Sequence, residues 1–248
     1  MLRLDDPTSL SLLFHLNSEP WLNDAAYQNA AGQTALEGLG GEPVVALPPP
    51  EQSPLTELLR RRRSVRAFLP QPLAVTAVAT LAAAAQGVVE TVGRDEGSGF
   101  ERRAAPSAGG LHPLTLHLFA RRVDGLEDGA YRYEPHTHAL AELALGDPTE
   151  RLAPALYAFP FVADANAIFA LVARFSRTQA KYGPRGYRYM LLEAGHAAQN
   201  LCLRAVELGL GSLCIGGFLD SQVNDMLGLR AQEAGAVYMV AVGHPGEE

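Results

Sequence analysis

The chain has 248 residues, of which 48% are apolar and 19% charged, and its 20 basic and 27 acidic residues give a formal net charge of −7. This composition is typical of a globular protein and excludes a disordered or fibrous chain. The acidic balance argues against nucleic acid as a partner, and no apolar run reaches the roughly 18 residues of a membrane helix, so we expect neither nucleic acid nor membrane as partners.

Two regions differ along the chain. Residues 1–52 become rich in Gly and Pro from Gly32 to Pro50, and we expect an N-terminal arm that packs on the remainder without a core of its own. The compact domain is expected at 53–248. It begins with a helix that Ser53 caps, with Pro54 in the first turn and a run of arginines at the end.

The rest of the chain alternates helical and strand patterns. Helices are expected at 75–86, 148–157, 185–208 and 220–227, from their apolar spacing and their flanking residues. Strands are expected at 114–120, 130–133, 139–145, 165–175, 212–215 and 236–242, where β-favouring residues lie between turn signals. These elements predict an α+β fold with helices packed on a sheet.

Motifs for several common chemistries are incomplete. The GLG sequence at 209–211 lacks the third glycine of a dinucleotide fingerprint, and neither a P-loop nor a serine-hydrolase elbow occurs. His136 and His138 are better explained as polar residues of a hairpin than as ligands, so we expect no metal. Cys202 and Cys214 lack a redox-type spacing and are expected to be buried, reduced residues. The first six residues are unlike a secretory signal, and we expect a cytoplasmic protein.

Three segments favour a ligand site. RRRRSVRAF, from Arg60 to Phe68, gathers guanidinium groups that match phosphate oxygens, although a solvated basic helix end is an alternative. In RRAAPSAGGLHP, from Arg102 to Pro113, small residues would let a flat ligand lie on the backbone, or would simply turn the chain. The third segment is the small-residue helix at 188–200 with the GLGSLCIGGF segment that follows, where tight helix packing is the alternative to a ligand site. His196 in this helix is expected to be a core histidine.

In combination, the motifs RRSVRAF, AAQG, PSAGGLHPL, GAYRYEPHTHAL, LEAGHAAQNL and GLGSLCIGGF resemble the nitroreductase superfamily of flavin enzymes over about residues 53–245. They resemble more closely its azoline dehydrogenase branch, whose members oxidise thiazolines and oxazolines in peptides to thiazoles and oxazoles. The resemblance implies a nitroreductase-like α+β fold, with a central mixed or antiparallel sheet flanked by helices and FMN bound at a homodimer interface.

The resemblance also assigns individual residues to the flavin. It implies that Arg62, Arg63 and Ser64 hold the phosphate and ribityl end of FMN. Arg66 would face the N1 and O2 edge, where a positive charge stabilises the anionic reduced flavin. The remaining cofactor contacts that it implies are Pro106, Ser107, Ala108 and Gly109 along the ring, Gly216 and Gly217 near N5 or O4, and Gln199.

Lys181 and Tyr182, in RTQAKYGPRGYRY, resemble the Lys–Tyr pair that serves catalysis in the azoline branch; a surface loop before a helix is the alternative. We therefore expect an FMN-dependent oxidase that matures natural products by removing a proton and a hydride from a peptide azoline. Its substrate would be a peptide or small heterocycle, and a cyclodehydratase complex is a candidate partner. Two alternatives stay open: an NAD(P)H-dependent nitroreductase or quinone reductase, and a flavin-free structural subunit of a maturation complex.

Overall fold

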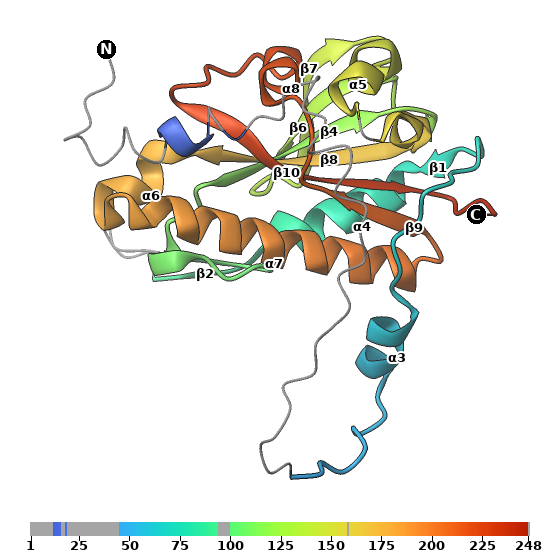
Figure 1. The fold of residues 1–248 in the computed structure, drawn as a ribbon, viewed down its shortest axis with the longest axis horizontal. Helices are drawn as coiled ribbons and strands as arrows, with labels where there is room; N and C mark the ends of the chain where they lie inside the picture. The colour runs from blue at the N-terminus through green and yellow to red at the C-terminus, as the bar shows by residue number, and fades with distance from the viewer. Residues whose placement is uncertain (1–11, 16–17, 19–44, 94–99, 158, 248) are drawn as a thin grey trace.

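The fold is built on a six-stranded sheet with the strand order β7-β6-β4-β8-β10-β9, in which all neighbours are antiparallel (Figure 1). The computed structural model describes residues 12–15, 18, 45–93, 100–157 and 159–247. No helix in these ranges is long and apolar enough to cross a membrane. The strands are β4 (Leu114–Ala120), β6 (Gly129–Glu134), β7 (Ala139–Leu145), β8 (Ala167–Arg174), β9 (Gly211–Ile215) and β10 (Ala234–Gly243).

Helices cover both faces of this sheet, so the expected α+β fold is confirmed. On one face lie α4 (Val75–Gln86) and α7 (Arg185–Glu207), and on the other lie α5 (Thr149–Ala155), α8 (Asp220–Met226) and the short η2 (Pro160–Asp164). Alternate residues of β8 therefore enter two different cores: Phe169 and Leu171 face α7, while Ile168 and Val172 face the other layer. A strand buried on both faces reads as a continuous apolar run.

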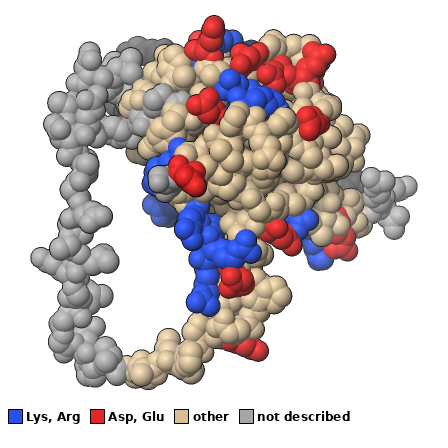
Figure 2. Space-filling model, turned by 90° about the vertical axis from the view of Figure 1, so that its right-hand side faces the viewer, with Lys and Arg blue, Asp and Glu red and all other residues tan. Residues whose placement is uncertain are grey.

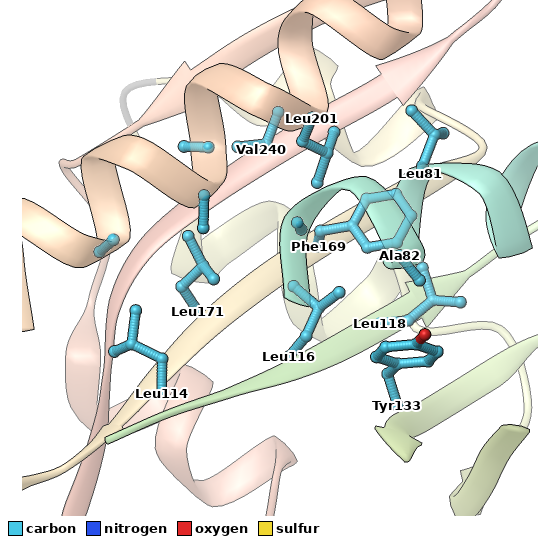
Figure 3. Close-up of a cluster of buried hydrophobic side chains, with 14 of the residues drawn as sticks. Leu81, Ala82, Leu114, Leu116, Leu118, Tyr133, Phe169, Leu171, Leu201 and Val240 are labelled. Atoms are coloured by element: carbon cyan, nitrogen blue, oxygen red, sulfur yellow. The ribbon is translucent and has the colours of Figure 1, made fainter. Parts of the chain in front are cut away.

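The core between α7, α4 and the sheet fixes the position of α7. Leu201 of α7, Leu81 of α4, and Leu116 and Phe169 of the sheet point toward one another in this layer (Figure 3). Each such buried side chain stabilises the fold by about 1.5–3 kcal/mol. The alanines at 194, 197 and 198 are buried on the same side of α7 and add little bulk, which allows the long helix to lie close to the strands.

Several short elements were not expected from the sequence. The strand expected at 165–175 ends as β8 at Arg174, and α6 (Phe175–Tyr182) begins immediately afterwards. The backbone N–H of Arg174 donates to the Pro113 carbonyl, but that of Phe175 donates to the Glu233 carbonyl, so the sheet ladder ends here. The hairpin of β2 (Val88–Val92) and β3 (Phe100–Arg103) was also missed, as was the parallel pair of β1 (Leu73–Ala74) and β5 (Val123–Asp124).

The expected N-terminal arm lies largely outside the described residues. Within it, Leu12 joins the core under α7, and Nδ1 of His15 lies 3.0 Å from the Tyr187 hydroxyl. The next element is α3 (Pro54–Arg61), which Ser53 caps by accepting the N–H of Thr56, as expected. Figure 1 shows α3 standing away from the body of the protein, and none of its residues is buried.

Candidate active site

The basic segment after α3 lies against β9, the edge strand of the sheet. Ser64 forms an isolated parallel bridge with Ser212, and the N–H of Val65 donates to the Ser212 carbonyl at 3.0 Å. Val65 is buried, and its side chain occupies the space that a Cβ on Gly211 would need. These contacts place three arginines beside β9: the half-buried Arg62 and the exposed Arg63 and Arg66.

This segment has the charge that a phosphate group requires. Figure 2 shows basic side chains gathered where α3 meets the body, a patch formed by Arg60, Arg61, Arg62, Arg63 and Arg66. In the part of the chain that the structure describes, no carboxylate forms an ion pair with Arg62 or Arg63. Guanidinium groups bind phosphate oxygens in bidentate fashion, so the segment fits the phosphate end of FMN.

The far end of β9 carries the expected glycine pair. Gly216 is exposed, and among the described residues a Cβ added there would meet only the Tyr238 ring, at 3.8 Å. The backbone at Gly216 is therefore open to a flat ligand. β9 pairs with β10 on one side, and on its other side the described residues provide only the bridge at Ser212. Gly216 and Gly217 directly follow this edge strand in the chain, which fits contacts to a flavin ring.

The two cysteines lie side by side next to these glycines, with their Sγ atoms 3.5 Å apart. Cys202 on α7 is buried as expected, but Cys214 on the edge strand is exposed, so the prediction for Cys214 was wrong. A hydrogen bond from Cys202 lowers the pKa of the Cys214 thiol, and Tyr238 and the charge of Arg62 act in the same direction. An exposed thiol thus lies on β9 next to the glycine pair, on the face of the sheet that meets α7.

The loop from Pro106 to Gly110 forms a second part of the candidate site. The hydroxyl of Ser107 accepts the N–H of His112 at 2.9 Å, and the N–H of Gly110 donates to the Ser107 carbonyl at 3.1 Å. Gly109 and Gly110 both have φ in the left-handed region, at 63° and 65°, which favours glycine. A cavity of about 500 Å³ lies along the loop, between it and β3.

Lys181 and Tyr182 lie directly against this loop. A Cβ built on Gly109 would be 2.6 Å from the Tyr182 hydroxyl and 2.8 Å from Nζ of Lys181, so a larger residue there would displace the ends of both side chains. Nζ lies 5.2 Å from the centroid of the Tyr182 ring, which in turn packs edge-on against Tyr189. The pair does not lie in a surface loop: it forms the last turn of α6, before Gly183 with φ 56°.

Sequence reasoning missed Glu193, a buried carboxylic acid of α7 that supports the same loop. Its side chain is 3% exposed and hydrogen-bonds Ser107. Burial raises the pKa of Glu193 to about 7, while the Ser107 hydrogen bond and the charges of Arg103 and Arg177 act in the opposite direction. The signal in the sequence was a single acid among the small residues of LEAGHAAQN.

The predicted site residues fall into two parts: the arginine segment with β9, and the Ser107 loop with Lys181 and Tyr182. The two parts contact α7 at different positions along the helix. Glu193 touches the Ser107 loop and Cys202 touches β9, and these two positions are about 13 Å apart along the helix, at about 1.5 Å per residue. Gln199 lies between them in sequence, on the exposed face of α7. His196 is on this exposed face too, so the expectation of a core histidine was wrong.

Comparison with known proteins identifies the family. The profile of the Nitroreductase family matches residues 59–244. A protein of Methanocaldococcus jannaschii that carries the name nitroreductase is 34% identical over 192 residues, which are 77% of this chain and 93% of that protein. The microcin B17-processing protein McbC of Escherichia coli is 32% identical over 137 residues. The matched residues are 53% of this chain and 50% of McbC.

Solved structures share the fold. A chain of the Escherichia coli microcin synthetase McbBCD complex, with truncated pro-MccB17 bound, superimposes with a TM-score of 0.68 at 22% identity, over 95% of this chain and 87% of that one. A Desulfovibrio desulfuricans protein described as a nitroreductase in complex with FMN gives 0.54 at 18% identity, over 79% and 89%. With the family profile over three quarters of its length, this chain belongs to the nitroreductase family and is an FMN-dependent oxidoreductase.

Proposed function

We propose that this oxidoreductase is a dehydrogenase of peptide azolines, which converts thiazolines or oxazolines to thiazoles or oxazoles during natural-product maturation. The observation that carries the proposal is the contact of Lys181 and Tyr182 with Gly109, in the loop assigned to the flavin ring. Lys181 is also the single lysine among the 20 basic residues of the chain. A lysine amine can exchange a proton with a substrate whereas an arginine stays protonated, so lysine is the basic residue type suited to proton transfer here.

The reaction needs a base beside the hydride acceptor. Aromatising an azoline removes a proton from the ring carbon next to the peptide carbonyl and a hydride from the neighbouring ring carbon. Bound FMN supplies the hydride acceptor. One of the two side chains, Lys181 or Tyr182, takes the proton, and the other holds the azoline by a hydrogen bond. The similarity to a microcin B17-processing protein supports a peptide as the substrate.

We propose further that two copies of the chain complete each flavin site. β9, beside the arginine segment and Gly216, contacts α7 at Cys202, whereas the Ser107 loop contacts α7 at Glu193. This separation supports a site shared between subunits. Leu55 and Leu59 of α3 are 55% and 51% exposed, on a helix none of whose residues is buried in the described chain. Such a helix gains stability by burying its leucines against a partner. The likeness to a chain of a microcin synthetase complex supports a cyclodehydratase as an additional partner.

A second candidate is an NAD(P)H-dependent nitroreductase or quinone reductase. The observation in its favour is the relative from Methanocaldococcus jannaschii, which bears the name nitroreductase and matches over 93% of its length. The two candidates share the flavin site and differ in the hydride donor. The family's use of FMN leaves the flavin-free structural subunit without support.

Substitution of the pair tests the proposal. Lys181→Ala and Tyr182→Phe should retain bound FMN and the dimer mass while turnover of an azoline peptide falls roughly 10²- to 10⁴-fold, the usual contribution of a general base or acid. Arg185→Ala removes an exposed cation four residues from Lys181 and is the control, expected to keep wild-type turnover. Wild-type rates in both variants, or simple loss of flavin from both, would show that the pair is structural.

A further inference from the structure

A second cavity, of about 140 Å³, adjoins the cavity along the Ser107 loop and has no role in the reaction described above. Arg103 and His112 line both this cavity and the larger one along the Ser107 loop. Arg177, on its wall, belongs to α6 and lies one helical turn before Lys181. A group bound in this cavity would therefore be a neighbour of the ring that reacts.

Three guanidinium groups from three separate elements line the cavity: Arg103 of β3, Arg132 of β6 and Arg177 of α6. Arg103 is paired with Glu101 at 3.3 Å, and Arg132 with Glu134 at 2.7 Å. Among the described residues, Arg177 forms neither an ion pair nor a hydrogen bond. The wall itself carries three arginines and one carboxylate, that of Glu134, because Glu101 does not line the cavity. Glu101 also lies 3.2 Å from Nδ1 of His136, which does.

Two buried polar side chains of the wall are only partly satisfied. The Arg103 side chain is 9% exposed and donates to Gln86 at 3.1 Å, yet its Nε has no partner within the described ranges. His112 is 6% exposed; its Nε2 lies 3.0 Å from the Glu101 carbonyl oxygen, and its Nδ1 has no partner in the same ranges. Burial lowers the pKa of His112, and the charges of Arg103 and Arg177 lower it further. Because the neutral His112 ring donates through Nε2, its Nδ1 is an acceptor, and the orphaned donor of the wall is the Arg103 Nε–H. A buried N–H donor without an acceptor calls for a ligand oxygen.

We propose that this cavity binds a carboxylate of the substrate, from an acidic side chain or from a peptide C-terminus, and so selects azolines with an acidic neighbour. Its volume corresponds to about four or five waters at roughly 30 Å³ each, which is room for a carboxylate with one or two methylene groups. The free fork of Arg177 matches the two carboxylate oxygens. The identity of the substrate as a peptide azoline rests on the proposed function, whereas the anion site stands on its own lining.

The anion site is tested on the FMN-loaded protein with propionate as the probe and the uncharged propionamide as its isostere. Propionate should shift the NMR signal of the Arg103 Nε–H and saturate with a Kd of about 1 mM, the range of a small anion, while propionamide leaves the signal in place. Arg177→Gln should weaken propionate about five- to tenfold. Arg174→Gln removes an exposed arginine that does not line the cavity, and it should bind propionate as the wild type does.

Equal shifts with propionate and propionamide, or unchanged propionate affinity in Arg177→Gln, would overturn the proposal. A second contradicting result is obtained by adding FMN to the apoprotein. If FMN shifts the Arg103 signal and then prevents propionate from binding, the cavity holds the flavin phosphate instead. These results do not depend on turnover, so failure to oxidise any azoline would refute the proposed function and leave the anion site standing.

The source of the carboxylate is decided by four azoline peptides, with Glu or Gln beside the ring and with a free or amidated C-terminus. Under the proposal, one of the two carboxylates lowers KM relative to its amide, and Arg177→Gln removes that difference. If KM is the same for all four peptides in an active enzyme, the cavity does not select the substrate.

Discussion

A buried acid holds the loop on which the candidate catalytic pair rests. Ser107 hydrogen-bonds the Glu193 side chain on α7 and accepts the N–H of His112, so the loop is tied to the helix behind it. A carboxyl group that is 3% exposed resists ionisation, because the charged form loses its hydration. The protonation state of Glu193 therefore bears on the stability of the protein near neutral pH.

Glu193→Gln should remove a pH dependence of stability. Burial raises the pKa of Glu193 from 4.5 to about 7 in the folded protein, so between these values the folded state holds a proton that the unfolded chain releases. Stability from this group is fully present below the lower value and falls by about 3 kcal/mol as pH rises to the upper one. Urea unfolding at about pH 5 and about pH 8 measures the loss.

The wild type should lose more stability over this interval than Glu193→Gln, whose amide does not titrate. The control is Glu150→Gln, at an exposed position of α5, which should follow the wild type. Parallel losses in the wild type and Glu193→Gln would contradict the assignment.

Among the elements, the Ser107 loop joins backbone geometry to the candidate chemistry. Gly109 and Gly110 have nearly the same positive φ, but a Cβ on Gly109 would strike Lys181 and Tyr182, whereas a Cβ on Gly110 would meet no atom within 4 Å in the described chain. Alanine would therefore be strained at either position, but only at Gly109 would it also contact Lys181 and Tyr182.

Gly109→Ala and Gly110→Ala separate these effects. Both variants should lose about 1 kcal/mol or more of stability, because alanine is strained at positive φ. Only Gly109→Ala should also displace the side chains of Lys181 and Tyr182, and so lose azoline turnover well beyond its loss of stability. Turnover, FMN content and urea unfolding are measured on both. Equal turnover in the two variants would contradict the contact between the loop and the pair.

Some elements could be predicted from the sequence and others could not, for physical reasons. The apolar spacing of α4 and α7 and the buried runs of β4 and β8 mark those elements, because each must match a core face. The start of α6 depends on where the backbone of Arg174 and Phe175 finds partners, namely Pro113 and Glu233. These partners are far away in sequence, so no local pattern reveals the boundary.

The candidate site shows the same division. Its motifs, from Arg62 to Gly217, could be recognised only in combination, as a resemblance to a family, because each alone is also explained by tight packing, a turn or a solvated helix end. That Ser107 meets Glu193 and that Gly109 meets Lys181 are contacts between distant segments, which the sequence does not display. The exposure of Cys214 follows from β9 lying at the edge of the sheet, a matter of strand order.

For the whole molecule, the proposed dimer predicts that oligomeric state and flavin binding are linked. The double variant Leu55→Glu with Leu59→Glu places two charges on the exposed leucines of α3 and should yield a monomer that has lost most of its FMN. Leu145→Glu, at an edge-strand position that is 50% exposed, is the matched control and should remain a dimer with flavin. Sedimentation and flavin absorbance measure both properties. A monomer that retains stoichiometric FMN would contradict a shared site.

The hydride donor distinguishes the azoline dehydrogenase from the nitroreductase. In an anaerobic stopped-flow experiment, the FMN-loaded protein is mixed either with an azoline peptide or with NAD(P)H, and the oxidised flavin absorbance is followed. We predict that the azoline peptide bleaches the flavin within a single turnover, that Lys181→Ala slows this phase roughly 10²-fold or more, and that NAD(P)H leaves the flavin oxidised. Rapid bleaching by NAD(P)H, with none by the azoline peptide, would contradict the account and assign the protein to the reductases.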